Sequence, residues 1–255
     1  MVGESKEKLG DGAGAFETRL MSAKNKHRTC AYCRKLKKAT VDHVPPKLLL
    51  EQPFPPNLLT VPCCSDCNQG FKADDEYTRT VIGLDVRASK NAAAQYNLPA
   101  IIRSLQRPDA RGFAEYIASQ SSASAILGPD GNPMGQMIEA DRKRVDNSGA
   151  RIIRGLYFIE MKRPLPEHAI LKVASKAGLT AEHPHMQTIA RAWGTVADHR
   201  NRAVGTAFSY SAAVGEGVSF WLLLLYDYFF WAGTIDERIP DGKTDSAAAQ
   251  GLPAA

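Results

Sequence analysis

The sequence predicts an α+β protein in which a small zinc module is followed by a larger α+β domain. Two Cys-x-x-Cys pairs, Cys30/Cys33 and Cys64/Cys67, stand thirty residues apart near the N-terminus. Helical periodicity follows from residue 76, and strand-like alternation follows from residue 204. A chain of 255 residues is long enough for one large or two modest domains.

Composition narrows the class of protein further. The apolar share of 44% and the charged share of 23% are ordinary for a globular protein. A net charge of +5 suits a nucleic-acid partner without demanding one. Five cysteines are too few for a disulfide scaffold and indicate a reducing, cytoplasmic setting. Residues 1–14 lack the apolar region of a signal peptide.

The first third of the chain divides into a tail and the zinc module. Residues 1–20 are expected to form a flexible tail, and residues 21–78 the module. Within the module we expect a strand over residues 38–44, stopped by Pro45 and Pro46, and a proline-rich loop over residues 52–56. A short helix should begin near the second cysteine pair and run through Asn68 towards Asp75.

The second domain is expected over residues 79–240. Residues 76–118 have a helical pattern, in which Pro99 opens one segment and Pro108 closes it. A loop should span residues 119–135, and an amphipathic helix residues 151–161. Residues 204–234 predict a strand pair with a bend near Asp227 and a further strand through Trp231. The tail, 241–255, should be disordered.

One apolar run, residues 220–231, raises the question of a membrane span. It falls short of the roughly 20 residues that a spanning helix needs, and Asp227 interrupts it. We therefore expect a buried strand and no membrane partner. Its aromatic side chains should belong to the core rather than to a base-stacking surface.

The paired cysteines predict a zinc ion bound by Cys30, Cys33, Cys64 and Cys67. A site of four sulfurs has no open position for water, so its role should be structural. Cys63 leaves a second register open, in which it would pair with Cys67 at x3 spacing. Otherwise Cys63 should be a small packed residue.

The order of the motifs resembles a known family. Cys30-x-x-Cys33, Val41-Asp42-His43-Val44-Pro45, Asn57-Leu58 and Cys64-x-x-Cys67-Asn68 together resemble the HNH endonucleases of the ββα-metal type, in their zinc-stapled branch. The resemblance covers residues 27–77 and favours Cys64 over Cys63 as the ligand. Two features depart from it: the stretch over residues 58–63 is slightly long, and Gly70 and Phe71 precede Lys72.

The resemblance implies a role for each polar residue of the module. His43 would be the general base, since a neutral imidazole takes up a proton near pH 7. Asp42 and Asn68 would bind a catalytic Mg²⁺ or Mn²⁺ through oxygen. Asn57 would fix the loop that holds His43, and Lys72 would reach a phosphate. In a regular strand Asp42 and His43 face opposite ways, so both serve one site only if the strand ends or bulges there.

A basic segment precedes the Asp-His pair. Residues 18–41 contain no acidic residue. The segment is either a solvated arm or a surface that contacts phosphates, and the nuclease motif favours the second. Its predicted nucleic-acid-binding residues are Lys24, Lys26, Arg28, Arg34, Lys35, Lys37 and Lys38.

Together these features predict a metal-dependent HNH endonuclease that hydrolyses DNA. Two alternatives stay open: a catalytically silent zinc module that binds nucleic acid, and a nuclease directed at RNA. The second domain would supply target choice, an interface for a homo-oligomer, or regulation.

Overall fold

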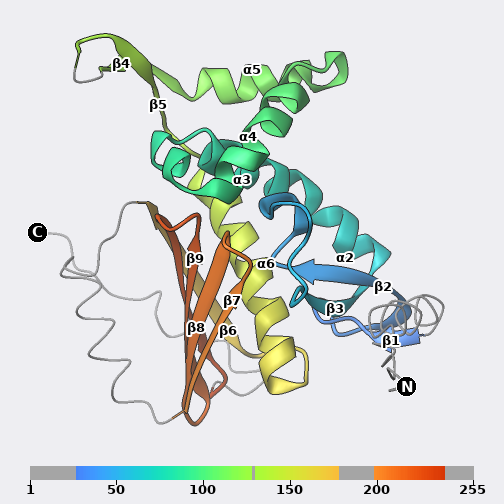
Figure 1. The fold of residues 1–255 in the computed structure, drawn as a ribbon. Coiled ribbons are helices and arrows are strands. Elements are labelled where there is room, and N and C mark those ends of the chain that lie inside the picture. Colours follow the sequence, from blue (N-terminus) through green and yellow to red (C-terminus); the bar gives the residue numbers. More distant parts are fainter. Residues whose placement is uncertain (1–26, 128–129, 178–197, 239–255) are drawn as a thin grey trace, which may run out of the picture.

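The computed structural model describes residues 27–127, 130–177 and 198–238. Both predicted tails, Lys24 and Lys26 lie outside these ranges. Helices and antiparallel sheets both occur in the described part (Figure 1), which confirms the α+β class.

The N-terminal part of the fold is a small sheet followed directly by helices. Strands β1 (His27–Thr29), β2 (Leu36–Val44) and β3 (Leu59–Cys64) are antiparallel, in the order β1-β2-β3. A 3-10 turn, η1 (Lys47–Leu49), follows the two prolines, and α2 (Ser65–Gly70) leaves β3 without a loop. The result is the strand-strand-helix order β2-β3-α2 at the cysteine pairs.

Helices fill the middle of the chain, as predicted, but one boundary is wrong. They are α3 (Lys72–Gly83), η2 (Val86–Lys90), α4 (Ala92–Leu105), η3 (Pro108–Ala110) and α5 (Arg111–Ser119). Pro99 lies inside α4 instead of opening it. The helix begins earlier because the Asn91 side chain accepts hydrogen bonds from the amides of Ala93 and Ala94. Pro99 is exposed, so water can satisfy the carbonyl that lacks its donor.

The predicted loop over residues 119–135 is mostly a hairpin. Strand β4 (Ser121–Leu127) pairs antiparallel with β5 (Pro133–Ile138). Gly131 and Asn132 belong to its tip, where Gly131 has φ 77° and the Asp130 side chain accepts from the amide of Asn132, whereas serines that also favoured a loop lie in β4. The serines and alanines of β4 carry little strand propensity, so pairing with β5 decides their conformation.

The C-terminal part is a five-stranded antiparallel sheet in the order β6-β10-β9-β8-β7. Its strands are β6 (Ile170–Ala177), β7 (Asp198–Val204), β8 (Phe208–Val214), β9 (Val218–Leu225) and β10 (Phe229–Asp236). The predicted strands over residues 207–231 are confirmed, whereas β6 and β7 were not predicted. The bend at Asp227 is a three-residue turn, Tyr226 to Tyr228, in which Tyr226 and Asp227 have φ 52° and 63°.

The apolar run 220–231 therefore belongs to β9, this turn and β10. Trp221, Leu223, Leu225 and Trp231 are buried, and the residues between those of β9 are half-exposed. No helix in the described ranges is long and apolar enough to cross a membrane.

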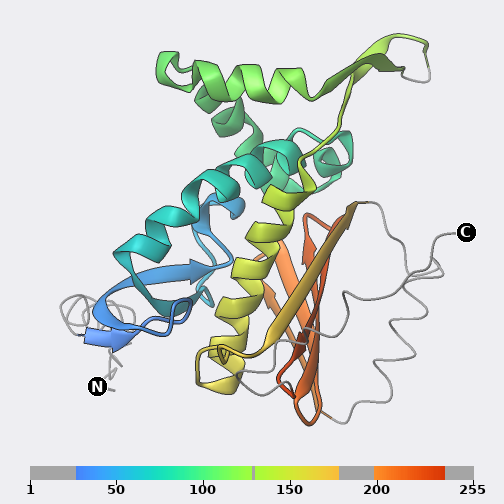
Figure 2. The same ribbon diagram turned by 180° about the vertical axis from the view of Figure 1, so that it is seen from behind.

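The long helix α6 (Arg142–Met161) lies between the two sheets, as both ribbon views show (Figures 1 and 2). It packs on β2, β3 and α3 on one side and on β6 and β10 on the other. Its start precedes the predicted residue 151, because the Asp141 side chain caps it by accepting from the amide of Arg144. One apolar core runs through both parts, and the predicted boundary after residue 78 falls inside α3.

Candidate metal centre and nuclease site

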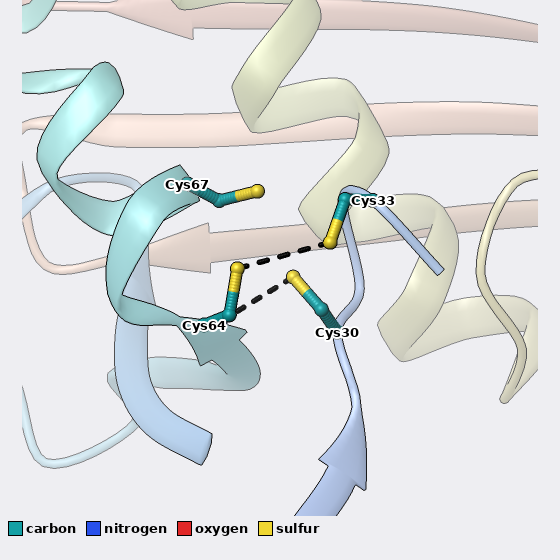
Figure 3. Close-up of side chains that lie close together, drawn as sticks. All are labelled: Cys30, Cys33, Cys64 and Cys67. Atoms are coloured by element: carbon teal, nitrogen blue, oxygen red, sulfur yellow. Dashed lines mark hydrogen bonds between the residues drawn. The ribbon is translucent and has the colours of Figure 1, made fainter. Parts of the chain in front are cut away.

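Four cysteines converge between the small sheet and α2 (Figure 3). Cys30 and Cys33 come from the turn between β1 and β2, Cys64 ends β3, and Cys67 lies in α2. Their sulfurs all lie within 4.8 Å of one another, and the Cys33 and Cys64 sulfurs are 3.7 Å apart. Four sulfurs about 2.3 Å from one zinc ion in a tetrahedron would be roughly 3.8 Å apart. The cluster is compatible with a structural zinc.

The structure also decides the register of the second pair. Cys63 is not in the cluster of four; it is fully buried, and its thiol donates to the Cys64 carbonyl at 3.3 Å. Cys64 contributes its sulfur, and its amide donates to the Cys30 sulfur at 3.4 Å. An N–H bond to sulfur favours the thiolate form that a metal ion needs.

Backbone hydrogen bonds form the turn that brings the sulfurs of Cys30 and Cys33 together. The Arg34 amide donates to the Cys30 carbonyl, and the Cys30 amide donates to the Lys35 carbonyl, both at 3.0 Å. The turn is closed by Arg34 at φ 63°, a left-handed conformation that glycine adopts more readily. Burial raises the pKa of Cys33 and Cys67, which favours their neutral thiol form. A bound cation would therefore be needed for all four cysteines to be thiolates together.

Asp42, the predicted ligand of a catalytic ion, is buried in an ion pair. Its Oδ2 accepts a hydrogen bond from the Tyr32 hydroxyl, and its Oδ1 accepts one from Arg151 of α6. Arg151 also pairs with Asp75 of α3. Burial raises the pKa of the Asp75 carboxyl to about 6, against the opposing effect of Arg151.

Sequence reasoning missed Tyr32, Asp75 and Arg151 as neighbours of Asp42. One feature of the sequence points to Arg151: it stands beside Ile152 and Ile153 in the apolar part of the predicted helix. A charged side chain buried there needs a partner of opposite charge. No pattern connects it to Asp42, since 109 residues separate the two.

The strand runs straight through Asp42 and His43. Asp42 pairs with Val61 and His43 with Thr60 in an unbroken antiparallel register. The expected bulge is therefore absent at this point of the described sheet, and the two side chains leave β2 on opposite faces. Pro45 and Pro46 end the strand at Val44, one residue past His43. They come too late in the chain to turn either side chain towards the other face.

His43 is half-buried on the face opposite Asp42. Burial lowers the pKa of its imidazole, and the nearby Lys47 cation lowers it further, while Asp42 opposes both. Within the residues that the structure describes, no group hydrogen-bonds the imidazole. A neutral ring with free nitrogens is the form in which histidine accepts a proton.

The remaining predicted site residues lie at separate positions. Asn68 is half-buried, with its amide nitrogen 3.5 Å from the Thr40 hydroxyl on the same face of β2 as Asp42. Lys72 is exposed at the start of α3. The Phe71 amide, between α2 and α3, donates a hydrogen bond to the Cys67 carbonyl four residues earlier, so the helical hydrogen-bond pattern continues from α2 into α3. Asn57 does make a side-chain bond to backbone, but the acceptor is the Ala203 carbonyl of β7 at 2.7 Å. It ties the loop to the large sheet.

The described basic residues differ in their partners. Lys37 pairs with Asp66 at 2.5 Å, and Arg34 pairs with Glu167 at 3.0 Å. Arg28, Lys35 and Lys38 are exposed, and within the described ranges none of them forms an ion pair. We call these three residues the basic surface. Arg28 lies directly opposite Lys37 in the β1–β2 ladder, a like-charge arrangement that an anion would stabilise.

Comparisons with models of protein families, with curated proteins and with solved structures gave no match.

Proposed function

We propose that this protein is a metal-dependent endonuclease of the HNH type that hydrolyses phosphodiester bonds in DNA, with His43 as its general base. One observation carries the proposal: four clustered thiols tie β2 and β3 to α2, with the Asp-His pair on the central strand. This is the order of elements expected of a ββα-metal module.

The chemistry follows from the surroundings of His43. Hydrolysis requires a base that removes a proton from water at near-neutral pH. The depressed pKa of His43 keeps its imidazole neutral there, and the unprotonated ring nitrogen can accept the proton. The exposed ammonium of Lys72 and the basic surface would bind the phosphates on either side of the bond.

The donor set also suits a divalent ion. A carboxylate offers about four acceptor positions, and the bonds from Tyr32 and Arg151 to Asp42 take two of them. Asp42 and Asn68 offer the hard oxygen ligands that Mg²⁺ or Mn²⁺ prefers. They lie on the face of β2 opposite His43, so a phosphate would have to reach around the end of the strand at Val44 to meet both the ion and the base. Such an ion would stabilise negative charge on the phosphate and on the leaving oxygen.

One observation favours a second candidate, a zinc module that binds nucleic acid without cutting it. Asp42 is only 5% exposed, and each of its oxygens already accepts a hydrogen bond. The basic surface would serve this function unchanged.

Replacement of the base separates the two candidates. We expect His43→Ala to slow the nicking of supercoiled plasmid in Mg²⁺ by about 10² to 10⁴-fold, the usual contribution of a general base. DNA affinity should change little, because cationic contacts to phosphates dominate it. His27→Ala, which removes an exposed histidine from β1, is the matched control and should cut like the wild type.

Two further arms complete this experiment. A chelator should abolish cutting, and an RNA substrate tests the alternative target. Equal cleavage rates for His43→Ala and the wild type would disprove the role of His43 as the general base. Binding without cleavage by the wild type in Mg²⁺ and Mn²⁺ would identify the silent module.

A further inference from the structure

The contact that ties Asp42 to the distant helix α6 is a buried cluster of charges. Asp42 of β2, Asp75 of α3 and Arg151 of α6 are 5%, 5% and 4% exposed. One terminal nitrogen of Arg151 bonds Oδ1 of Asp42, and the other bonds Oδ2 of Asp75. The guanidinium therefore bridges two carboxylates from separate elements.

Aromatic rings hold the bridge in place. The Arg151 guanidinium lies over the Phe71 ring, 5.0 Å from its centre. The Tyr32 ring meets Phe71 edge-on at 4.8 Å, and its hydroxyl donates to the second oxygen of Asp42. Both Asp42 oxygens are thus fixed by groups outside β2, which leaves the carboxylate one orientation.

The charges of this cluster do not cancel, as they would in a simple ion pair. Two carboxylates face one guanidinium, so the fully ionised cluster holds a net charge of −1. Oδ1 of Asp75 and Nε of Arg151 are buried and make no hydrogen bond of ordinary geometry among the described residues, although the Ser148 hydroxyl lies close enough to the Asp75 carboxylate to lower its pKa. Buried ion pairs contribute little net stability compared with apolar residues of similar size. Net stability is therefore a weak explanation for burying these charges, and the residual negative charge of the cluster would be offset by a cation bound close to it.

We propose that Arg151 is a positioning residue of the candidate nuclease site, which fixes the Asp42 carboxylate from α6 in the orientation that receives a divalent cation. The inference rests on the proposed function, because it takes Asp42 as a ligand. Lysine cannot replace this residue, since an ammonium lacks the planar fork that reaches two carboxylates at once. The second half of the chain thereby forms part of the site.

The test compares Arg151→Lys with Arg144→Lys in the full-length zinc-loaded protein. Arg144 lies on the same helix and pairs with Asp74 of α3 at 2.9 Å, so its replacement also weakens the α6–α3 contact but does not touch Asp42. Mn²⁺ binding is followed by the electron paramagnetic resonance of the free ion, without DNA. We expect Arg151→Lys to bind Mn²⁺ about 10- to 100-fold more weakly, the usual effect of losing a partner that orients a ligand. The Mg²⁺ concentration for half-maximal cleavage should rise by the same factor.

Arg144→Lys should bind Mn²⁺ like the wild type. Unchanged Mn²⁺ binding by Arg151→Lys would overturn the proposal, and tighter binding would show that Arg151 competes with the ion. Absence of Mn²⁺ binding in the wild type would also overturn it. If the wild type binds Mn²⁺ but does not cleave, the proposed function fails and the positioning role is judged on Mn²⁺ binding alone.

A second variant covers a failure of Arg151→Lys to fold. Asp75→Asn keeps the shape of the side chain, removes one anchor of Arg151 and brings the net charge of the cluster to zero. Both effects should weaken Mn²⁺ binding several-fold. Binding as tight as in the wild type would again overturn the proposal.

Discussion

Cys63 and Cys64 are neighbours in β3, yet only one of them belongs to the metal centre. Both are buried, so burial does not distinguish them. The difference is the position of the sulfur: the Cys63 thiol contacts Cys30 but lies outside the cluster of four. Cys64 meets the sulfurs of the first cysteine pair, and Cys63 bonds a backbone carbonyl, as a serine could.

Serine substitutions test this assignment. Cys64→Ser should reduce the zinc content from about one ion per chain to near zero, and it should lower the soluble yield, because metal binding is coupled to folding. Cys63→Ser should retain zinc and solubility. Elemental analysis of both purified variants provides the measurement, and loss of zinc from Cys63→Ser alone would reverse the register.

The pKa of His43 predicts how cleavage depends on pH. Because burial and Lys47 lower this pKa, the imidazole becomes neutral at a lower pH than an ordinary histidine. Cleavage should therefore rise with pH, with a midpoint below about 6.5. Lys47→Gln removes the cation that opposes protonation, so the midpoint should move to higher pH with the plateau unchanged. A pH–rate profile at low ionic strength tests both statements, and a midpoint that moves to lower pH in Lys47→Gln would contradict them.

At the scale of elements, α6 organises the molecule. Its glycines let it approach both sheets: a Cβ at Gly155 would meet Val44 of β2 at 2.6 Å, and one at Gly149 would clash with the Trp231 ring of β10. The Trp231 indole also donates to the Val145 carbonyl of α6 at 3.0 Å. A helix with larger residues at these positions would hold the two sheets further apart.

Gly149→Ala should therefore destabilise the protein, although alanine is the better helix former by about 1 kcal/mol. Overpacking against a rigid ring typically costs about 1 to 3 kcal/mol. Gly112 of α5 is the matched control, since a Cβ added there would meet no atom within 4 Å. Gly112→Ala should leave the free energy of unfolding unchanged or raise it by up to about 1 kcal/mol. Denaturant unfolding measures both, and equal stabilisation by the two alanines would disprove close packing at Gly149.

At the scale of the whole molecule, the zinc module and the large sheet share one core. Helix α6 contacts both, the Asn57 amide bonds β7, and the charge cluster joins β2, α3 and α6. These contacts predict that the two parts unfold together rather than as independent domains.

Removal of zinc from the cysteine cluster tests whether the large sheet unfolds together with the zinc module. Trp221 and Trp231 are buried in the large sheet, away from the cysteines. A strong chelator should lower the thermal midpoint reported by tryptophan fluorescence, and added Zn²⁺ should restore it, because zinc binding contributes to the folding free energy. A tryptophan transition indifferent to zinc would show that the sheet folds alone.

Features that depend on local chemistry could be predicted from the sequence. Spacing identified the four cysteines, because a Cys-x-x-Cys turn presents two sulfurs to one ion. Alternation predicted β8, and the apolar run that follows it predicted β9 and β10 on either side of the bend at Asp227. Neither pattern revealed β6 or β7, whose mostly exposed residues become strands only by pairing with β10 and β8.

The surroundings of the candidate site depend on long-range packing and could not be predicted from the sequence. The Asp-His dipeptide marks the candidate site in the sequence, but the straight register of β2 places the Asp42 and His43 side chains on opposite faces. Arg151 reached Asp42 because α6 packs across β2, and no local pattern encodes a contact between residues 109 positions apart. Long-range contacts are set by how the elements pack, which depends on the whole chain at once.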